Sequence, residues 1–191
     1  MLRAREKGDT IIEVLFAIAV FSLIAVGGLS IMNQGTALAQ RALEINLVRQ
    51  QIDTQSEAIR YINQSYVADF GKNGTPTQLW NQVAVNNAVS SAADFDAIVV
   101  DGRCVLPAKA FAIDTTKMAT NPLLSPTATP ATYSKIRYDA PLPRAEGIWV
   151  QAVKRSGTGF YDFHIRACWD SPGRSSPMTL GTIVRLYEPA G

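Results

Sequence analysis

The chain has 191 residues, of which 47% are hydrophobic, and its 18 Lys and Arg residues nearly balance 16 Asp and Glu residues. It has one histidine and neither a glycine-rich phosphate loop nor a Ser/His/Asp signature, so we expect neither enzymatic activity nor a bound cofactor. No basic tract stands out beyond scattered Arg and Lys, so DNA as a partner has no support from the charge pattern.

The first 32 residues combine a short basic leader with a long apolar segment. Residues 1–8 contain Arg3, Arg5 and Lys7, and the nineteen residues 14–32 carry no charge. As a helix, residues 11–32 would be roughly 33 Å long, enough to cross the hydrocarbon core of a membrane. Basic residues ahead of a span stay in the cytoplasm. We therefore expect a single-pass membrane protein in contact with lipid, with its N-terminus cytoplasmic and everything after Met32 extracytoplasmic.

Glu13 places a carboxylate at the start of the apolar segment, where an ionised group needs a partner. One interpretation is a capping box, in which Thr10 and Glu13 satisfy amide groups at the helix start. The other is that the chain is cut after Gly8, which frees an α-amino group on Asp9 one helical turn away. Glu13 would then balance the amine of its own chain or of a neighbouring copy.

These features, a basic leader ending in Gly8, Glu13 five residues later and an unbroken apolar helix, resemble the prepilin N-terminus of type IV pilins and pseudopilins. The resemblance implies cleavage by a prepilin peptidase between Gly8 and Asp9, and a role for Glu13 in processing and subunit docking. It also implies methylation of the new amine, although the best-known pilins begin with Phe instead of Asp. Two alternatives stay open: an ordinary secretory signal cut near Ala39, and an uncleaved signal anchor.

Residues 34–70 are predicted to continue the helix with an apolar stripe on one side. The stripe consists of Leu38, Ile45, Val48, Ile52, Ile59 and Ile62, with Gln55 at one of its positions. Charged residues occupy the rest of the circumference: Arg41, Glu44, Arg49, Asp53, Glu57 and Arg60. The pattern indicates an amphipathic helix that continues the membrane helix, so that a single helix runs from Thr10 to about Tyr66. Its stripe is covered by a globular head or, alternatively, by a coiled-coil partner.

Residues 71–191 are predicted to form a β-rich head. Residues 147–154, 160–169 and 180–187 are rich in β-branched and aromatic residues and are separated by short turns, which indicates an antiparallel meander packed on the helix. Tyr161, Phe163, Ile165, Ala167 and Trp169 mark its core face. Residues 115–132 are rich in Thr and Pro, and we expect them to form a solvated loop that does not pair with a strand. Alternatively, this loop carries glycans or contacts a surface. Residues 161–169 and 182–187 also resemble the C-terminal ends of pilin-like proteins.

Two cysteines, Cys104 and Cys168, lie in the part expected outside the cell, where an even count favours one disulfide. A metal site is not expected, because these thiols and His164 supply at most three ligands. The sequence has an acidic cluster made of Asp94, Asp96 and Asp101. It indicates either a set of calcium ligands or simply part of a loop.

The predicted fold class is α+β, with a leader (1–8), a transmembrane and assembly helix (9–33), an amphipathic helix packed on the head (34–70) and an extracytoplasmic head (71–191). The predicted function is that of a structural subunit, a minor pilin or pseudopilin, of a type IV pilus-like filament or a related secretion or DNA-uptake system. Its expected partners are the prepilin peptidase, other pilin subunits and the inner-membrane assembly machinery, and it would reach the cell surface after assembly. The alternative is a single-pass, membrane-anchored binding or adhesion module that does not polymerise.

Overall fold

The computed structural model describes residues 11–94, 96–115, 127–128, 136–137, 144–145, 147–171 and 174–189. The helical elements are α1 (Ile11–Ala68), α2 (Thr75–Trp80), the π-helix η1 (Asn81–Val85) and the 3-10 helix η2 (Asp96–Ile98). The strands are β1 (Ala88–Val89), β2 (Val99–Val100), β3 (Arg103–Cys104), β4 (Ala112–Ile113), β5 (Thr127–Ala128), β6 (Ile136–Arg137), β7 (Arg144–Ala145), β8 (Gly147–Val153), β9 (Phe160–Trp169) and β10 (Met178–Tyr187). The expected α+β class is confirmed. The chain divides into two compact units, Met1–Ala42 and Leu43–Gly191.

The helix α1 is one uninterrupted α-helix of 58 residues. No proline occurs before Pro76, so no residue in this stretch removes a helical amide or clashes with the preceding turn. After Ala68 the backbone turns through two left-handed positions, Gly71 (φ 83°) and Asn73 (φ 49°). Glycine and asparagine adopt this conformation more readily than other residues, which explains why the helix ends here.

The sheet of the second unit has the strand order β1-β8-β9-β10. Strands β8, β9 and β10 form the predicted antiparallel meander, in which Gly147 pairs with Cys168 and Met178 pairs with Trp169. Strand β10 begins two residues earlier than predicted. Strand β1 pairs parallel with the end of β8, a long-range pairing that the sequence pattern did not predict.

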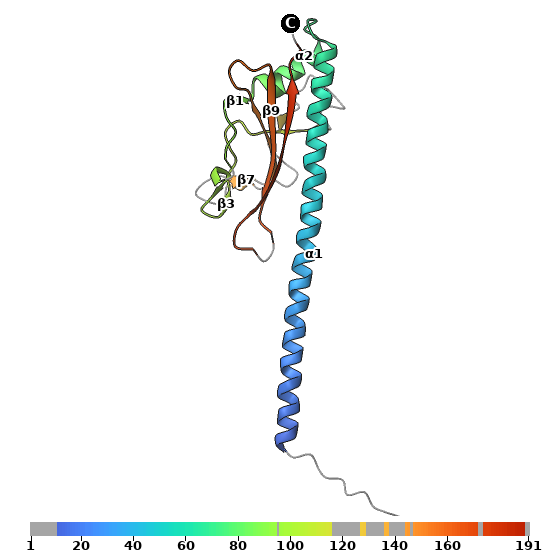
Figure 1. Cartoon of the computed structure of the whole chain (residues 1–191), viewed down its shortest axis with the longest axis vertical. Helices are drawn as coiled ribbons and strands as arrows, with labels where there is room; N and C mark the ends of the chain where they lie inside the picture. The colour runs from blue at the N-terminus through green and yellow to red at the C-terminus, as the bar shows by residue number, and fades with distance from the viewer. Residues whose placement is uncertain are drawn as a thin grey trace, which may run out of the picture. The chain divides into compact units, whose positions relative to one another are not determined.

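The main core lies between the head part of α1 and one face of this sheet (Figure 1). The predicted alternation of β9 is confirmed, since its expected core residues are all buried. From α1 the core receives Val48, Ile52, Ile59 and Ile62. Leu38, which the sequence placed on the same stripe, is exposed. The indole ring of Trp80, from the end of α2, stacks on the Tyr66 ring with 5.3 Å between centroids.

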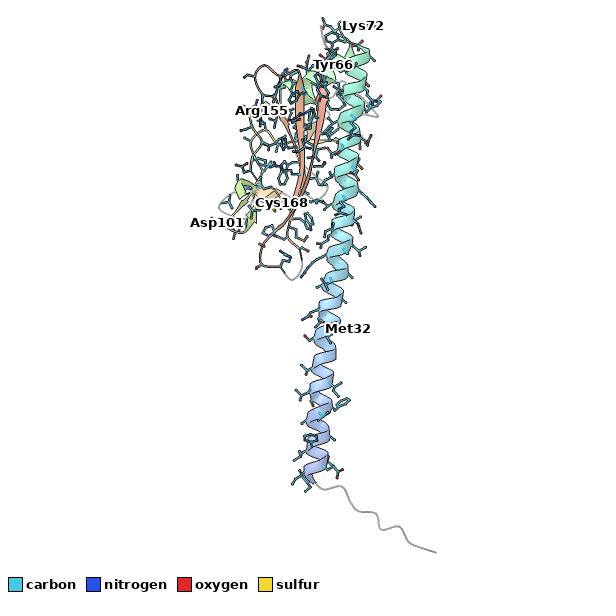
Figure 2. The ribbon with its side chains drawn as sticks, viewed as in Figure 1. Met32, Tyr66, Lys72, Asp101, Arg155 and Cys168 are labelled. Carbon is cyan, nitrogen blue, oxygen red and sulfur yellow. A yellow bond between two sulfur atoms is a disulfide. The ribbon has the colours of Figure 1, made fainter. Side chains whose placement is uncertain are left out.

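A second, smaller core covers part of the opposite face of the sheet. It consists of Ile98, Cys104, Trp149 and Cys168, which are all fully buried or nearly so. The sequence pattern predicted only one core face for β9, and that prediction was wrong at Arg166 and Cys168, which are buried on the second face. The reason is that the segment containing η2, β2 and β3 packs there. Figure 2 shows Asp101, between β2 and β3, on the side of the sheet away from α1.

The remaining strands are pairs of two residues each. β2 pairs with β3, β4 with β5, and β6 with β7, all antiparallel. The prediction of a loop without a ladder at residues 115–132 was wrong at Thr127–Ala128, because these residues pair with Ala112–Ile113. Apart from Thr115, the rest of that segment lies outside the described residues.

Candidate assembly site on the amino-terminal helix

The first half of α1 presents an apolar surface around its whole circumference. Every residue from 11 to 36 is exposed, including the large side chains of Ile11 (79%) and Phe21 (72%). The helix is long and apolar enough to cross a membrane, and none of its most apolar stretch is buried. Water-soluble proteins rarely leave so large a contiguous apolar patch exposed. This surface is therefore suited to contact with lipid or with other apolar helices.

Glu13 is the one carboxylate of this apolar surface. It lies in the first turn of the described helix and shares one side with Val14, Ala17, Ile18 and Phe21. No basic side chain in the described part of the chain is paired with it. A carboxylate among apolar side chains favours a cation that approaches from outside the helix, provided that water is excluded.

Three residues that the predictions for the helix start depend on fall outside the described residues. They are Gly8 and Asp9, which flank the expected cleavage position, and Thr10, the expected capping partner of Glu13. The capping and counter-charge interpretations of Glu13 therefore both stay predictions.

Gln55 joins α1 to the head through a buried pair of hydrogen bonds. Its amide nitrogen donates to the Ile113 carbonyl at 2.9 Å, and its amide oxygen accepts from the Ile113 backbone N–H at 2.8 Å. The Gln55 side chain thus makes with the β4 backbone the two hydrogen bonds that a neighbouring strand would otherwise make. The sequence placed Gln55 on the apolar stripe, and an amide at a core position was the signal that it has a buried polar partner.

Two further polar side chains of α1 bind the ends of the sheet. The Glu44 carboxylate accepts from the Trp169 indole N–H at 3.1 Å and from the Ser171 hydroxyl at 2.7 Å. At the other end of β10, the Asn63 amide donates to the Tyr187 carbonyl at 3.4 Å. Glu44 was predicted to be one of the charged residues outside the packed stripe, and that prediction was wrong. Nothing in the sequence separates Glu44 from the other carboxylates of α1, because its partners are more than a hundred residues away.

The exposed side of α1 in the second unit has an uncharged stripe. Leu43 (64% exposed), Leu47, Thr54 and Tyr61 (61% exposed) recur at steps of four and seven residues, which places them in one row along the helix. A charged row runs beside it and contains Arg49, Asp53, Glu57 and Arg60. In this row Arg60 and Glu57 form an exposed ion pair at 3.6 Å.

A disulfide joins Cys104 to Cys168, as expected, and attaches β3 to the sheet. Polar contacts beside it hold the same segment. The Gln151 side chain accepts from the Ala93 N–H at 3.1 Å and donates to the Ala108 carbonyl at 3.1 Å, while the Arg166 guanidinium donates to the Ala93 carbonyl. The disulfide and these contacts together hold residues 93–94 and 96–108 against the sheet.

His164 lies next to these contacts, with its Nδ1 atom 3.2 Å from a guanidinium nitrogen of Arg166. Burial lowers the pKa of His164, and the positive charge of Arg166 lowers it further, against an opposing contribution from Asp162. The hydrogen bond from Arg185 holds the pKa of Asp162 below its usual value, although burial acts in the opposite direction. The pKa of His164 therefore lies below its ordinary 6.5, and in the neutral ring an unprotonated Nδ1 can accept from the Arg166 guanidinium, which only donates.

The acidic cluster predicted from the sequence stays a prediction, because only two of its three side chains are described. Asp94 and Asp101 are both exposed, and the side chain of Asp96 lies outside the description. Within the described ranges, no group of three or more His, Cys, Asp or Glu side chains is placed to hold a metal ion.

Comparison with protein-family models gives no match, and neither the curated proteins nor the solved structures contain one. The class of protein to which this chain is compared is therefore defined by its fold alone. It is a membrane-compatible apolar helix that continues into an α+β head with one disulfide, an architecture compatible with a pilin fold.

Proposed function

We propose that this chain is a structural subunit, a minor pilin or pseudopilin, of a type IV pilus-like filament or a related secretion system. The observation that carries the proposal is the continuity of α1. One helix has an unburied apolar first half with a single carboxylate near its start, and a second half whose side chains bind the head. Such a helix can reside in a membrane before assembly and pack against other helices afterwards.

In this function the chain is made with its leader in the cytoplasm and its head outside. A prepilin peptidase cuts after Gly8, and the inner-membrane assembly machinery moves the processed chain into a filament of pilin subunits. The amine of Asp9, methylated or not, becomes the N-terminus. Glu13 balances the amine of a neighbouring subunit, and the uncharged stripe of α1, defined above by Leu43, Leu47, Thr54 and Tyr61, contacts neighbouring helices.

The processing step is tested by co-expression with a prepilin peptidase. The product should begin at Asp9, and Gly8→Val should block the cut. Gly27→Val is the matched control, because an added side chain at Gly27 meets open space within the chain. An intact leader, or a cut near Ala39, found by mass spectrometry would exclude the pilin function.

The assembly step is tested at Glu13. Loss of a capping interaction costs about 1 kcal/mol of local helix stability, whereas an unpaired amine in a low-dielectric bundle costs several kcal/mol. Glu13→Ala and Glu13→Gln should therefore both insert into the membrane and keep a folded head, but fail to enter filaments. Glu57→Ala, at an exposed carboxylate on the head half of α1, should enter them normally. Normal incorporation of both Glu13 variants would show that Glu13 is only a cap.

The alternative function, an anchored binding module, is favoured by the exposed outer face of β9 and β10. Ile183 (59%) and Tyr187 (64%) are exposed there, and the Arg185 guanidinium lies 4.0 Å from the centre of the Phe160 ring. Leu47→Lys separates the two functions, because a charge on the uncharged stripe blocks helix packing but does not touch this face. Loss of filament incorporation supports the subunit function when Asp53→Lys, on the charged row, has no effect. Equal behaviour of the two variants would favour the binding module.

A further inference from the structure

The turn between α1 and α2 contains the pair Asn73-Gly74, the single Asn-Gly sequence in the chain. Asn73 is exposed and has a left-handed backbone conformation with φ 49°. The neighbouring Lys72, whose N–H donates to the Asp69 carbonyl at 3.0 Å, lies at the end of the head where α1 stops (Figure 2). The Asn73 side-chain amide is therefore open to solvent water.

Gly74 offers a free backbone nitrogen next to this amide. Its carbonyl accepts the first hydrogen bond of α2, from Gln78 N–H at 3.1 Å, but no described residue accepts from its own N–H. Its extended conformation (φ −75°, ψ −175°) lies at the start of α2, where amide groups have no helical partner. The nitrogen is thus available for a reaction.

Gly74 cannot gain a side chain in this fold unless Asp69 moves. A Cβ atom there would lie 2.4 Å from Asp69 Oδ2, far inside van der Waals contact. The same carboxylate oxygen accepts from the Thr77 hydroxyl at 3.3 Å, so it is held in place. The packing therefore favours the one residue after Asn73 that leaves its nitrogen sterically open.

We propose that Asn73 is a site of spontaneous covalent modification, in which the Gly74 nitrogen attacks the side-chain amide carbon of Asn73. A bond forms between Gly74 N and Asn73 Cγ, the Gly74 nitrogen loses its proton, and the Asn73 amide leaves as ammonia. The product is a five-membered succinimide. Solvent water then opens this ring at either carbonyl, which yields aspartate or isoaspartate at position 73. No oxidant, reductant or enzyme is required.

Two other asparagines near this site lack the combination of features that Asn73 has. The Asn63 amide is buried and donates to the Tyr187 carbonyl, and the Asn87 amide donates to the Gln82 carbonyl at 2.7 Å. Each is also followed by a residue with a side chain. A folded chain should therefore react first at Asn73.

The modification changes the connection between α1 and α2. Each product adds a negative charge to a turn that already holds Asp69, and isoaspartate also lengthens the backbone by one methylene. The affected segment leads directly into α2, whose Leu79 and Trp80 side chains belong to the main core. A longer link should loosen the packing of Trp80 on Tyr66, so aged protein should melt at a lower temperature than fresh protein.

The experiment uses the purified full chain in detergent, incubated at mildly alkaline pH in heavy-oxygen water. The chymotryptic peptide 71–80 is then followed by mass spectrometry. The expected result is progressive loss of the unmodified peptide and a mixture of aspartate and isoaspartate products that contain one heavy oxygen, while peptides with Asn63 and Asn87 stay intact. Asn73→Gly retains a residue suited to positive φ and should abolish both the product and the age-dependent fall in melting temperature.

Two results would overturn the proposal. The first is an unchanged Asn73 under conditions that convert an unstructured peptide of residues 69–78, because the folded turn would then hold the reacting atoms apart. The second is conversion of Asn63 or Asn87 at the same rate as Asn73, which would show that the fold confers no selectivity.

Discussion

Replacing Gln55 with leucine tests how α1 holds the head. The substitution removes two hydrogen bonds to Ile113, whose side chain is 4% exposed, and leaves its backbone N–H and carbonyl buried without partners. Each unsatisfied group costs about 1–3 kcal/mol. The added burial of apolar surface returns about 1.5 kcal/mol. The free energy of unfolding should therefore fall by about 0.5–4.5 kcal/mol, against a total of about 5–15 kcal/mol for an ordinary domain.

The assay is urea unfolding of the full chain in detergent, followed by the fluorescence of the head tryptophans. Gln50→Leu is the matched control on the exposed side of the same helix, and it should change stability by less than about 0.5 kcal/mol. Gln55→Glu keeps an acceptor for the Ile113 N–H but places a second oxygen against the Ile113 carbonyl. It should be destabilised at neutral pH and recover partly in acid, where the carboxyl can donate.

Equal unfolding midpoints for Gln55→Leu, Gln50→Leu and the unmodified chain, with unchanged slopes, would refute this reasoning. Such a result would mean that Ile113 finds other hydrogen-bond partners or reaches water once the Gln55 amide is absent.

Three further predictions concern the head. Glu44→Ala should lower the free energy of unfolding by about 1.5–3 kcal/mol, because Ser171 loses a charged hydrogen-bond acceptor; Glu44→Gln should recover part of the loss in the same urea assay. Cys104→Ser removes a bond that spans 64 residues and should lower the free energy of unfolding by up to about 4 kcal/mol relative to the disulfide-bonded chain, and the reduced wild type should match the variant. The pKa of His164 is lower in the folded chain than its ordinary 6.5, so the unfolded chain takes up this proton first as pH falls. The stability associated with His164 is therefore complete above pH 6.5 and is lost as the pH falls below it, and His164→Gln should flatten the stability profile on the acid side of pH 6.5. An unchanged profile would contradict the last prediction.

Local patterns predicted the elements well where they were long and periodic. The stripe from Ile45 to Ile62 has helical spacing, and the alternation from Tyr161 to Trp169 has strand spacing; both follow from the backbone geometry of a single element. The disulfide could also be predicted, because two cysteines in a segment expected outside the cell have one way to pair. These predictions needed no knowledge of how distant segments meet.

The contacts that join α1 to the head could not be predicted in the same way. Ile113 is 58 residues from Gln55, and Ser171 is 127 residues from Glu44. A glutamate on an exposed helix face and a glutamate such as Glu44, which binds residues at the end of β9, have similar local sequences. Only the register of the packed elements distinguishes them.

The sequence by itself determined the apolar first half of α1, the position of Glu13 within it, the stripe that packs on the head and the three long strands. These follow from side-chain polarity repeated at the period of a helix or a strand. The tertiary structure decided that the second face of β9 is buried, that β1 joins the sheet in parallel and that Gln55 acts as a neighbouring strand for Ile113. These features depend on which distant segment covers each polar group. Burial of a hydrogen-bonding group is tolerated only where that segment supplies the partner.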